Sequence, residues 1–70
     1  MKHVLAQMPG TIIEIAIEPG DTVLEGQEIM VLEAMKMENS IVAPCNGRVA
    51  EVRVQKGNSV GFEQVLMTIE

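Results

Sequence analysis

Few side chains in this 70-residue sequence could do chemistry, and one lysine stands out by its neighbours. Lys36 lies between Met35 and Met37, within the stretch 33–38. A turn normally selects Gly, Asn, Asp, Pro or Ser, so two methionines beside an exposed charge have no local structural reason to be there. Methionine suits a surface that several partners must bind in turn, because its side chain is flexible and polarizable. The combination predicts a lysine displayed for covalent modification, with Met35 and Met37 as recognition flanks.

The ordinary role of an isolated turn lysine is solubility, and the flanking methionines argue against that role here. No His, Tyr or second Lys is close to Lys36 in the sequence. Nothing therefore prepares its amine for Schiff-base or general-base catalysis. We interpret Lys36 as a group on which enzymes act.

The other candidate groups are weaker. Cys45 is the only cysteine and has no His paired with it in the sequence, so we interpret it as a structural or incidental thiol. His3 is the only histidine, and a lone histidine does not form a metal site. We also expect the N-terminal segment that contains His3 to fray. The glycines mark turns, because no helix is predicted after any of them. Four acidic residues are expected to be solvating charges on outer faces and turns: Glu14, Glu18, Asp21 and Glu51.

An internal sequence repeat surrounds Lys36 and predicts two similar sets of secondary-structure elements on either side of it. Shifted by 37 positions, residues 2–33 lie over residues 39–70 without a gap. The spacer 34–38 joins the two halves, and Lys36 is its midpoint. Eight repeat pairs are identical: Ala6/Ala43, Gly10/Gly47, Glu14/Glu51, Gly20/Gly57, Val23/Val60, Gln27/Gln64, Met30/Met67 and Glu33/Glu70.

Each half predicts short strands separated by turns. Residues 11–18 alternate with a period of two, which predicts a half-buried strand whose inner face carries Ile13, Ile15 and Ile17. Residues 49–54 repeat the pattern, with Ala50, Val52 and Val54 inward. Turn chemistry follows both strands, at residues 19–21 and 56–58. Further short strands are predicted at residues 4–6, 22–24, 29–32, 41–43 and 65–69.

These strands predict an all-β fold. A half of this size cannot bury its own apolar face, so we expect the halves to pack as two sheets around one core. Phe62 is the only aromatic residue, so the core must consist of Ile, Val, Leu, Met and Ala. We predict one domain over residues 1–70, a sandwich or flattened barrel with pseudo-twofold symmetry. Lys36 would lie at one edge, at the tip of the hairpin that links the halves.

Composition excludes several classes of function. The net charge of −5 argues against a nucleic-acid backbone or an anionic membrane as partner. No uncharged apolar run approaches the length of about 20 residues that a membrane span needs, and the start lacks the apolar region of a secretion signal. A single cysteine allows no internal disulfide, which favours the cytosol, or the mitochondrial matrix in a eukaryote.

Three motifs together resemble the biotinyl domain of biotin-dependent carboxylases and decarboxylases. They are Ala34-Met35-Lys36-Met37 after an apolar strand, Met8-Pro9-Gly10 upstream, and the turn Gly20-Asp21-x-Val23. The likeness extends from about Val4 to Glu70. It implies a flattened barrel of two four-stranded antiparallel sheets. It also implies that Lys36 carries biotin in amide linkage and that Ala34, Met35 and Met37 are its recognition flanks.

The resemblance implies a carrier without catalytic activity of its own. In this family a biotin protein ligase attaches the biotin, a biotin carboxylase loads it with a carboxyl group using ATP and bicarbonate, and a carboxyltransferase passes that group to an acceptor. The isolated domain is expected to be monomeric. The sequence does not identify the acceptor, because that specificity lies in the transferase.

Two other functions remain open. A lipoyl carrier domain of a 2-oxo acid dehydrogenase-type complex shares the fold, but it typically has Asp before the lysine and Ala after it. The flanks Met35 and Met37 therefore favour biotin over lipoate. The second alternative is an unmodified interaction domain of this fold, as in adaptor proteins of transport systems. The Met-Lys-Met tip argues against it, because an unmodified domain does not need a lysine displayed between recognition flanks.

The sequence departs from the family pattern at two places. Gln7 stands where the first bend often has a proline, which should alter local stiffness only. The gapless repeat leaves no room for the protruding thumb loop that some bacterial acetyl-CoA carboxylase carriers insert in the first half. This favours the carriers of propionyl-CoA carboxylase, pyruvate carboxylase, transcarboxylase and the decarboxylases. The usual preceding Pro/Ala-rich linker is also missing, so we expect either a stand-alone subunit or the C-terminal domain of a longer chain.

Overall fold

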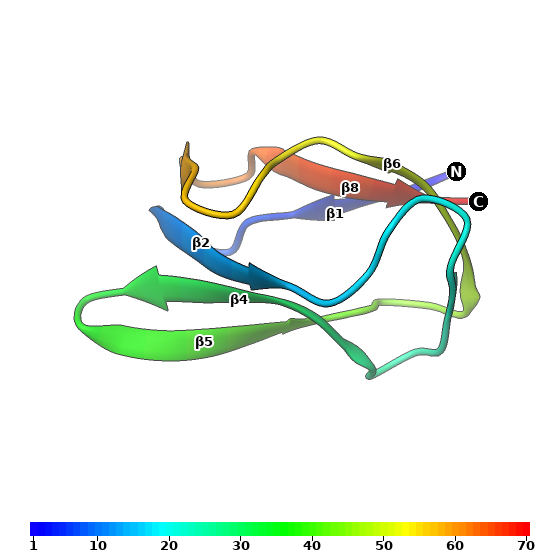
Figure 1. Ribbon diagram of the computed structural model, residues 1–70, viewed down its shortest axis with the longest axis horizontal. Coiled ribbons are helices and arrows are strands. Elements are labelled where there is room, and N and C mark those ends of the chain that lie inside the picture. Colours follow the sequence, from blue (N-terminus) through cyan, green and yellow to red (C-terminus); the bar gives the residue numbers. More distant parts are fainter.

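Eight β-strands make up the fold in the computed structural model, which describes all residues 1–70 (Figure 1). The strands are β1 (Lys2–Leu5), β2 (Gly10–Ile15), β3 (Thr22–Val23), β4 (Glu28–Ala34), β5 (Met37–Val42), β6 (Gly47–Val52), β7 (Ser59–Val60) and β8 (Val65–Ile69). None of the chain forms a helix that is long and apolar enough to cross a membrane. No thumb loop interrupts the first half, as predicted.

The strands form two four-stranded antiparallel sheets, which confirms the predicted fold class. The strand orders are β1-β8-β6-β3 and β5-β4-β2-β7. The two halves of the chain are not one sheet each, as the expected packing of two half-units suggested. Each sheet takes its central strands from one half and its outer strands from the other. Because of this exchange, the two halves are joined by backbone hydrogen bonds as well as by a shared core.

The repeat of the sequence is also a repeat of the backbone. The Gly20 N–H donates to the Val49 carbonyl at 2.8 Å, and the Gly57 N–H donates to the Ile12 carbonyl at 2.7 Å. Gly20 and Gly57 have φ of 96° and 94°. This left-handed region is open to glycine at little steric cost, which explains why the repeat keeps glycine at both positions.

A β-bulge in β2 changes which isoleucines face the core. Ile13 is the extra residue between Ile12 and Glu14, where the register against β4 shifts. Ile12 is therefore fully buried, whereas Ile13 is only partly covered and lies outside the core. The prediction of an inward Ile13 was wrong, because a bulge moves the alternation by one residue. Beyond the bulge, Ile15 packs against the core and Ile17 is buried, as predicted.

The second half contains the same bulge 37 positions later. Ala50 is the extra residue in β6, so Val49 fills the core and the predicted inward position of Ala50 was wrong. Val52 packs against the core as predicted. Register shifts on β4 and β8 leave Ile29 and Leu66 without a direct partner, again 37 positions apart. The bulges are thus part of the repeated unit.

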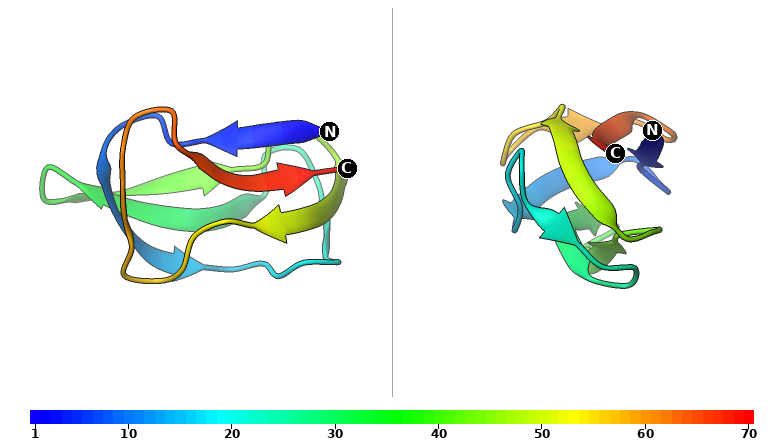
Figure 2. Two further views of the ribbon diagram at one scale, coloured as in Figure 1. Left: turned by 90° about the horizontal axis from the view of Figure 1, so that it is seen from above. Right: turned by 90° about the vertical axis from the view of Figure 1, so that its right-hand side faces the viewer.

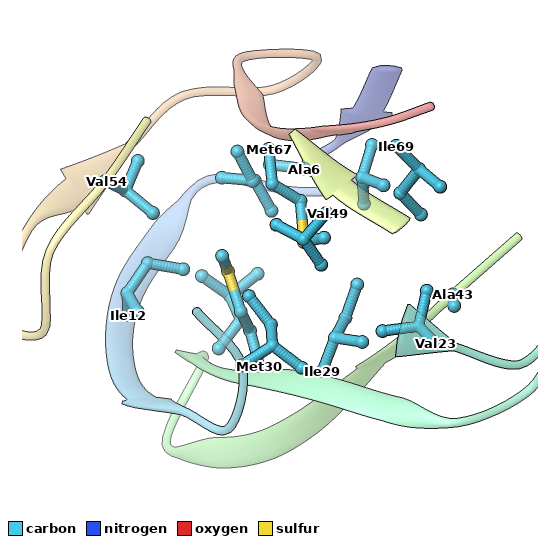
Figure 3. Packing of buried hydrophobic residues seen from close by; sticks show 14 of the residues in the cluster. Ala6, Ile12, Val23, Ile29, Met30, Ala43, Val49, Val54, Met67 and Ile69 are labelled. Carbon is cyan, nitrogen blue, oxygen red and sulfur yellow. The ribbon is translucent and has the colours of Figure 1, made fainter. Parts of the chain in front are cut away.

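The core contains no aromatic ring, as predicted. Fifteen buried residues form one cluster between the sheets, and Figure 3 shows 14 of them. Fourteen of them form seven repeat pairs, and the repeat mate of the remaining Val4 is the partly buried Ile41. The pairs are Ala6/Ala43, Ile12/Val49, Ile17/Val54, Val23/Val60, Ile29/Leu66, Met30/Met67 and Leu32/Ile69. The first half contributes eight of these residues and the second half seven, so both halves build one apolar interior.

The N-terminal segment is part of a sheet. His3 lies in β1 opposite Thr68 of β8, so the expectation that this segment frays was wrong. Pairing with β8 holds β1 in place from Lys2 onward. Both termini lie at one end of the long axis, which measures 31 Å, and the β4–β5 hairpin projects at the other end (Figures 1 and 2).

The bulge in β2 predicts unequal effects of two neighbouring substitutions. Ile12→Ala should lower the free energy of unfolding by about 2–4 kcal/mol, because it leaves a cavity in the core. Ile13→Ala should cost about 1 kcal/mol or less, since its side chain lies outside the core. Urea denaturation of both variants beside the parent chain measures the difference. Equal losses would contradict the bulge.

Candidate functional site

Lys36 lies in a two-residue turn between β4 and β5. Ala34 pairs with Met37, so only Met35 and Lys36 form the loop, which is shorter than the spacer 34–38. Their φ angles are 54° and 64°. Two positive φ angles are the mark of a type I′ turn, whose twist matches that of the flanking strands. The hairpin therefore continues the sheet and carries Lys36 to the end of the molecule, where the sequence predicted it (Figures 1 and 2).

This turn consists of residues that rarely adopt its backbone. Type I′ turns favour Asn and Gly, and a left-handed conformation costs roughly 1–2 kcal/mol for other residues. Pairing between β4 and β5 from Glu28 to Val42 holds the turn in place. Backbone strain of this kind is concentrated at functional sites. We infer that Met35 and Lys36 are present for what their side chains do outside the barrel.

Both methionines beside Lys36 face solvent. The exposed fraction is 89% for residue Met35 and 65% for residue Met37. Lys36 itself is also exposed. Neither methionine can contribute to the core, and both are free to contact an enzyme that approaches the lysine.

Ala34 has a different place from the other predicted flanks. Its residue is only 8% exposed and faces Gly10 of β2. A Cβ atom at Gly10 would lie 3.2 Å from that of Ala34 and would collide with the carbonyl oxygen of Glu33. The missing side chain lets β2 lie closely against the hairpin. Ala34 thus supports the tip from inside, and a partner at the tip meets Met35 and Met37 first.

The hairpin places two carboxylates beside the tip. Glu33 and Glu38 lie directly opposite each other and are both exposed. Like charges at opposite positions destabilise a strand pair. Sequence reasoning missed this pair, although the two glutamates are placed symmetrically about the Met35–Lys36 turn. A hairpin register centred on that turn would have predicted it.

The remaining candidates do not gather at Lys36. Cys45 follows β5 at the opposite end of the barrel, where it is partly buried against the core. No three His, Cys, Asp or Glu side chains are grouped as a metal site. A groove of about 410 Å³ lies between the outer strands β1 and β5, and Lys36 is not among its lining residues. The tip is therefore the candidate functional site.

Known sequences support a common family. Residues 2–69 match the family described as "Biotin-requiring enzyme". The chain is 48% identical over 63 residues to the human mitochondrial propionyl-CoA carboxylase alpha chain, covering 90% of this chain and 9% of the relative. It is 50% identical over 64 residues to the biotin carboxyl carrier protein of Streptococcus mutans, covering 91% and 49%. The chain thus spans about half of the second relative and a small part of the first.

Solved structures agree with the fold. A single-chain, multi-domain long-chain acyl-CoA carboxylase superposes with a TM-score of 0.87 at 38% identity, covering 94% of this chain and 6% of that one. The lipoyl domain of the Azotobacter vinelandii 2-oxoglutarate dehydrogenase complex superposes with a TM-score of 0.77 at 24% identity, covering 89% and 78%. The latter shows a shared fold alone.

The strained turn predicts a stabilising substitution. Met35→Asn should raise the free energy of unfolding by about 0.5–1 kcal/mol, because Asn tolerates the left-handed conformation. Met37→Asn is the matched control: Met37 lies in β5, where Asn is disfavoured, so no gain is expected. Chemical denaturation measures both. A gain at Met37 equal to that at Met35 would argue against strain in the turn.

Proposed function

Because this chain belongs to the family of biotin-requiring enzyme domains, we propose that it is a biotin carboxyl carrier with biotin in amide linkage on Lys36. The observation that carries the proposal is the exposed lysine on a strained turn between two exposed methionines. The likeness to the Streptococcus mutans carrier protein supports the same assignment. A group attached at this lysine would meet no covering element, so the tip fits a tethered cofactor.

The barrel supplies display and no catalytic step. Biotin, when attached, supplies a site that holds a transferable carboxyl group. The Lys36 amine is the point of attachment, and the β4–β5 hairpin keeps it away from the body of the domain. A polypeptide that continued from either terminus would leave the barrel at the end away from Lys36 (Figure 2). Such a tether would keep the carrier near both of its active sites at high effective concentration.

The partners of the carrier are those of a biotin-dependent carboxylase. We propose a biotin protein ligase for attachment, a biotin carboxylase that loads the carboxyl group and a carboxyltransferase that unloads it. The relatives are acyl-CoA and pyruvate carboxylases, which favours an acceptor of that type. The domain itself would be a monomer, and its free Cys45 agrees with a reducing compartment.

Lipoate is the alternative cofactor. The fold is shared with a lipoyl domain, as the superposition with the 2-oxoglutarate dehydrogenase complex indicates. The methionines on both sides of Lys36 favour biotin, and so do relatives at 48–50% identity whose names are those of biotin carriers or carboxylases. The mass added to Lys36 after expression with both ligases distinguishes the two cofactors.

Substituting the lysine tests the attachment site. Co-expressed with a biotin protein ligase, the chain should gain one biotin, and Lys36→Arg should gain none while it keeps its melting temperature. Lys56→Arg is the control, because Lys56 is also exposed in a turn. Intact-mass spectrometry and streptavidin blots measure the result. Undiminished labelling of Lys36→Arg would exclude Lys36 as the site.

Alanine substitutions test the role of the methionines. Met35→Ala and Met37→Ala should change the free energy of unfolding by no more than about 0.5 kcal/mol, as at other exposed positions. They should instead slow biotinylation and carboxyl transfer, because each removes a surface that the enzymes contact. Thermal melts and steady-state assays measure the two effects. A large loss of stability with unaltered kinetics would assign the methionines to packing.

A further inference from the structure

The only aromatic residue of the chain lies outside the core. Phe62 is 64% exposed, in the turn of residues 61–64 between β7 and β8. Its repeat mate is Glu25, so the same turn at the other end of the barrel forms without an aromatic residue. The fold therefore does not require Phe62. One exposed apolar side chain is ordinary by itself, and its position on the barrel is what makes it informative.

Strand register places this turn at the end of the barrel that carries Lys36. Val60, two residues before Phe62, pairs with Gly10 of β2. Gly10 in turn lies against Ala34, at the base of the hairpin tip. The two ribbon views agree, with the turn and the tip at the end away from the termini (Figures 1 and 2). Met35, Met37 and Phe62 thus expose apolar surface at one end.

The turn holds its residues in a defined position. The Glu63 N–H donates to the Ala6 carbonyl at 2.8 Å, and the Ala6 N–H donates to the Gln64 carbonyl at 3.0 Å. Glu63 has φ of 64°, where its repeat mate is Gly26. A non-glycine residue in this left-handed conformation costs conformational free energy, at Glu63 as at Met35 and Lys36. A preorganised turn loses little entropy when a partner binds Phe62.

We propose that Phe62 is a docking residue for the biotin protein ligase and enters an apolar pocket beside the ligase active site. This proposal rests on the proposed function. The ligase meets the chain before biotin is attached, so it must recognise protein surface. Enzymes that act on the loaded carrier also bind the cofactor. Aromatic residues often dominate such contacts, and Phe62 adds a second contact to the one made by Met35 and Met37.

Leu24 provides a matched control. It is 62% exposed and lies in the repeat-related turn at the opposite end of the barrel. The two turns share a hydrogen bond: the Leu24 N–H donates to Gln27 Oε1 at 3.0 Å, and the Gly61 N–H donates to Gln64 Oε1 at 2.9 Å. Leu24→Ala and Phe62→Ala therefore remove similar exposed apolar groups from equivalent turns. Only Phe62 lies at the end of the barrel that carries Lys36.

The test is biotinylation of the purified, unmodified chain by a biotin protein ligase with ATP and biotin. Phe62→Ala should raise the KM for the chain about fivefold or more, with kcat within about twofold. Phe62→Glu, which copies the residue of the equivalent turn, should raise it further. Leu24→Ala should leave both constants unchanged. Melting temperatures of the variants should match that of the parent chain.

Other outcomes would overturn either the docking role of Phe62 or the proposed function. Unchanged biotinylation of Phe62→Ala and Phe62→Glu would overturn the docking role, even if later carboxyl transfer were slower. An equal rise in KM for Leu24→Ala would also overturn it, since the effect would not depend on the end of the barrel. A loss that followed the melting temperature would make Phe62 structural. Failure of the parent chain to accept biotin would refute the proposed function instead.

Discussion

Backbone hydrogen bonds between the two halves of the chain hold the barrel closed. Turn glycines of each half donate to the strands of the other, from Gly20 to Val49 and from Gly57 to Ile12. The two acceptors are also buried core residues, each next to a bulge. Neither half can bury its apolar face alone, so these bonds and the shared core form together. A small domain without disulfides or metals gains its rigidity from this mutual dependence.

The two ends of the barrel differ, although the strand pairings at each end are equivalent. Leu32 pairs with Asn39 below the tip, and Ile69 pairs with Lys2 in the equivalent place at the other end. At the first end Met35 and Lys36 join the two paired strands in a turn, while residues 1 and 70 lie at the second end. Two features that break the repeat lie at the first end, namely the strained tip and the exposed Phe62.

Several properties could be read from the sequence because they depend on local pattern. Alternating apolar residues and turn glycines predicted strands, and the absence of aromatic residues other than Phe62 required an aliphatic core. The gapless repeat predicted two similar halves with Lys36 at their junction. Since a short spacer between antiparallel strands can only form a hairpin, the exposed position of Lys36 followed without knowledge of the sheet order.

Tertiary packing decided the rest. Ile12 and Ile13 are chemically equal, and only the bulge against β4 determines which one enters the core. The exchange of outer strands depends on pairings between distant segments, which the pattern of one segment does not encode. The same holds for His3, which is ordered by its pairing with β8. Phe62 lies at the same end of the barrel as Lys36, although the two residues are 26 positions apart in the chain. This placement likewise follows from strand register, which the local sequence does not encode.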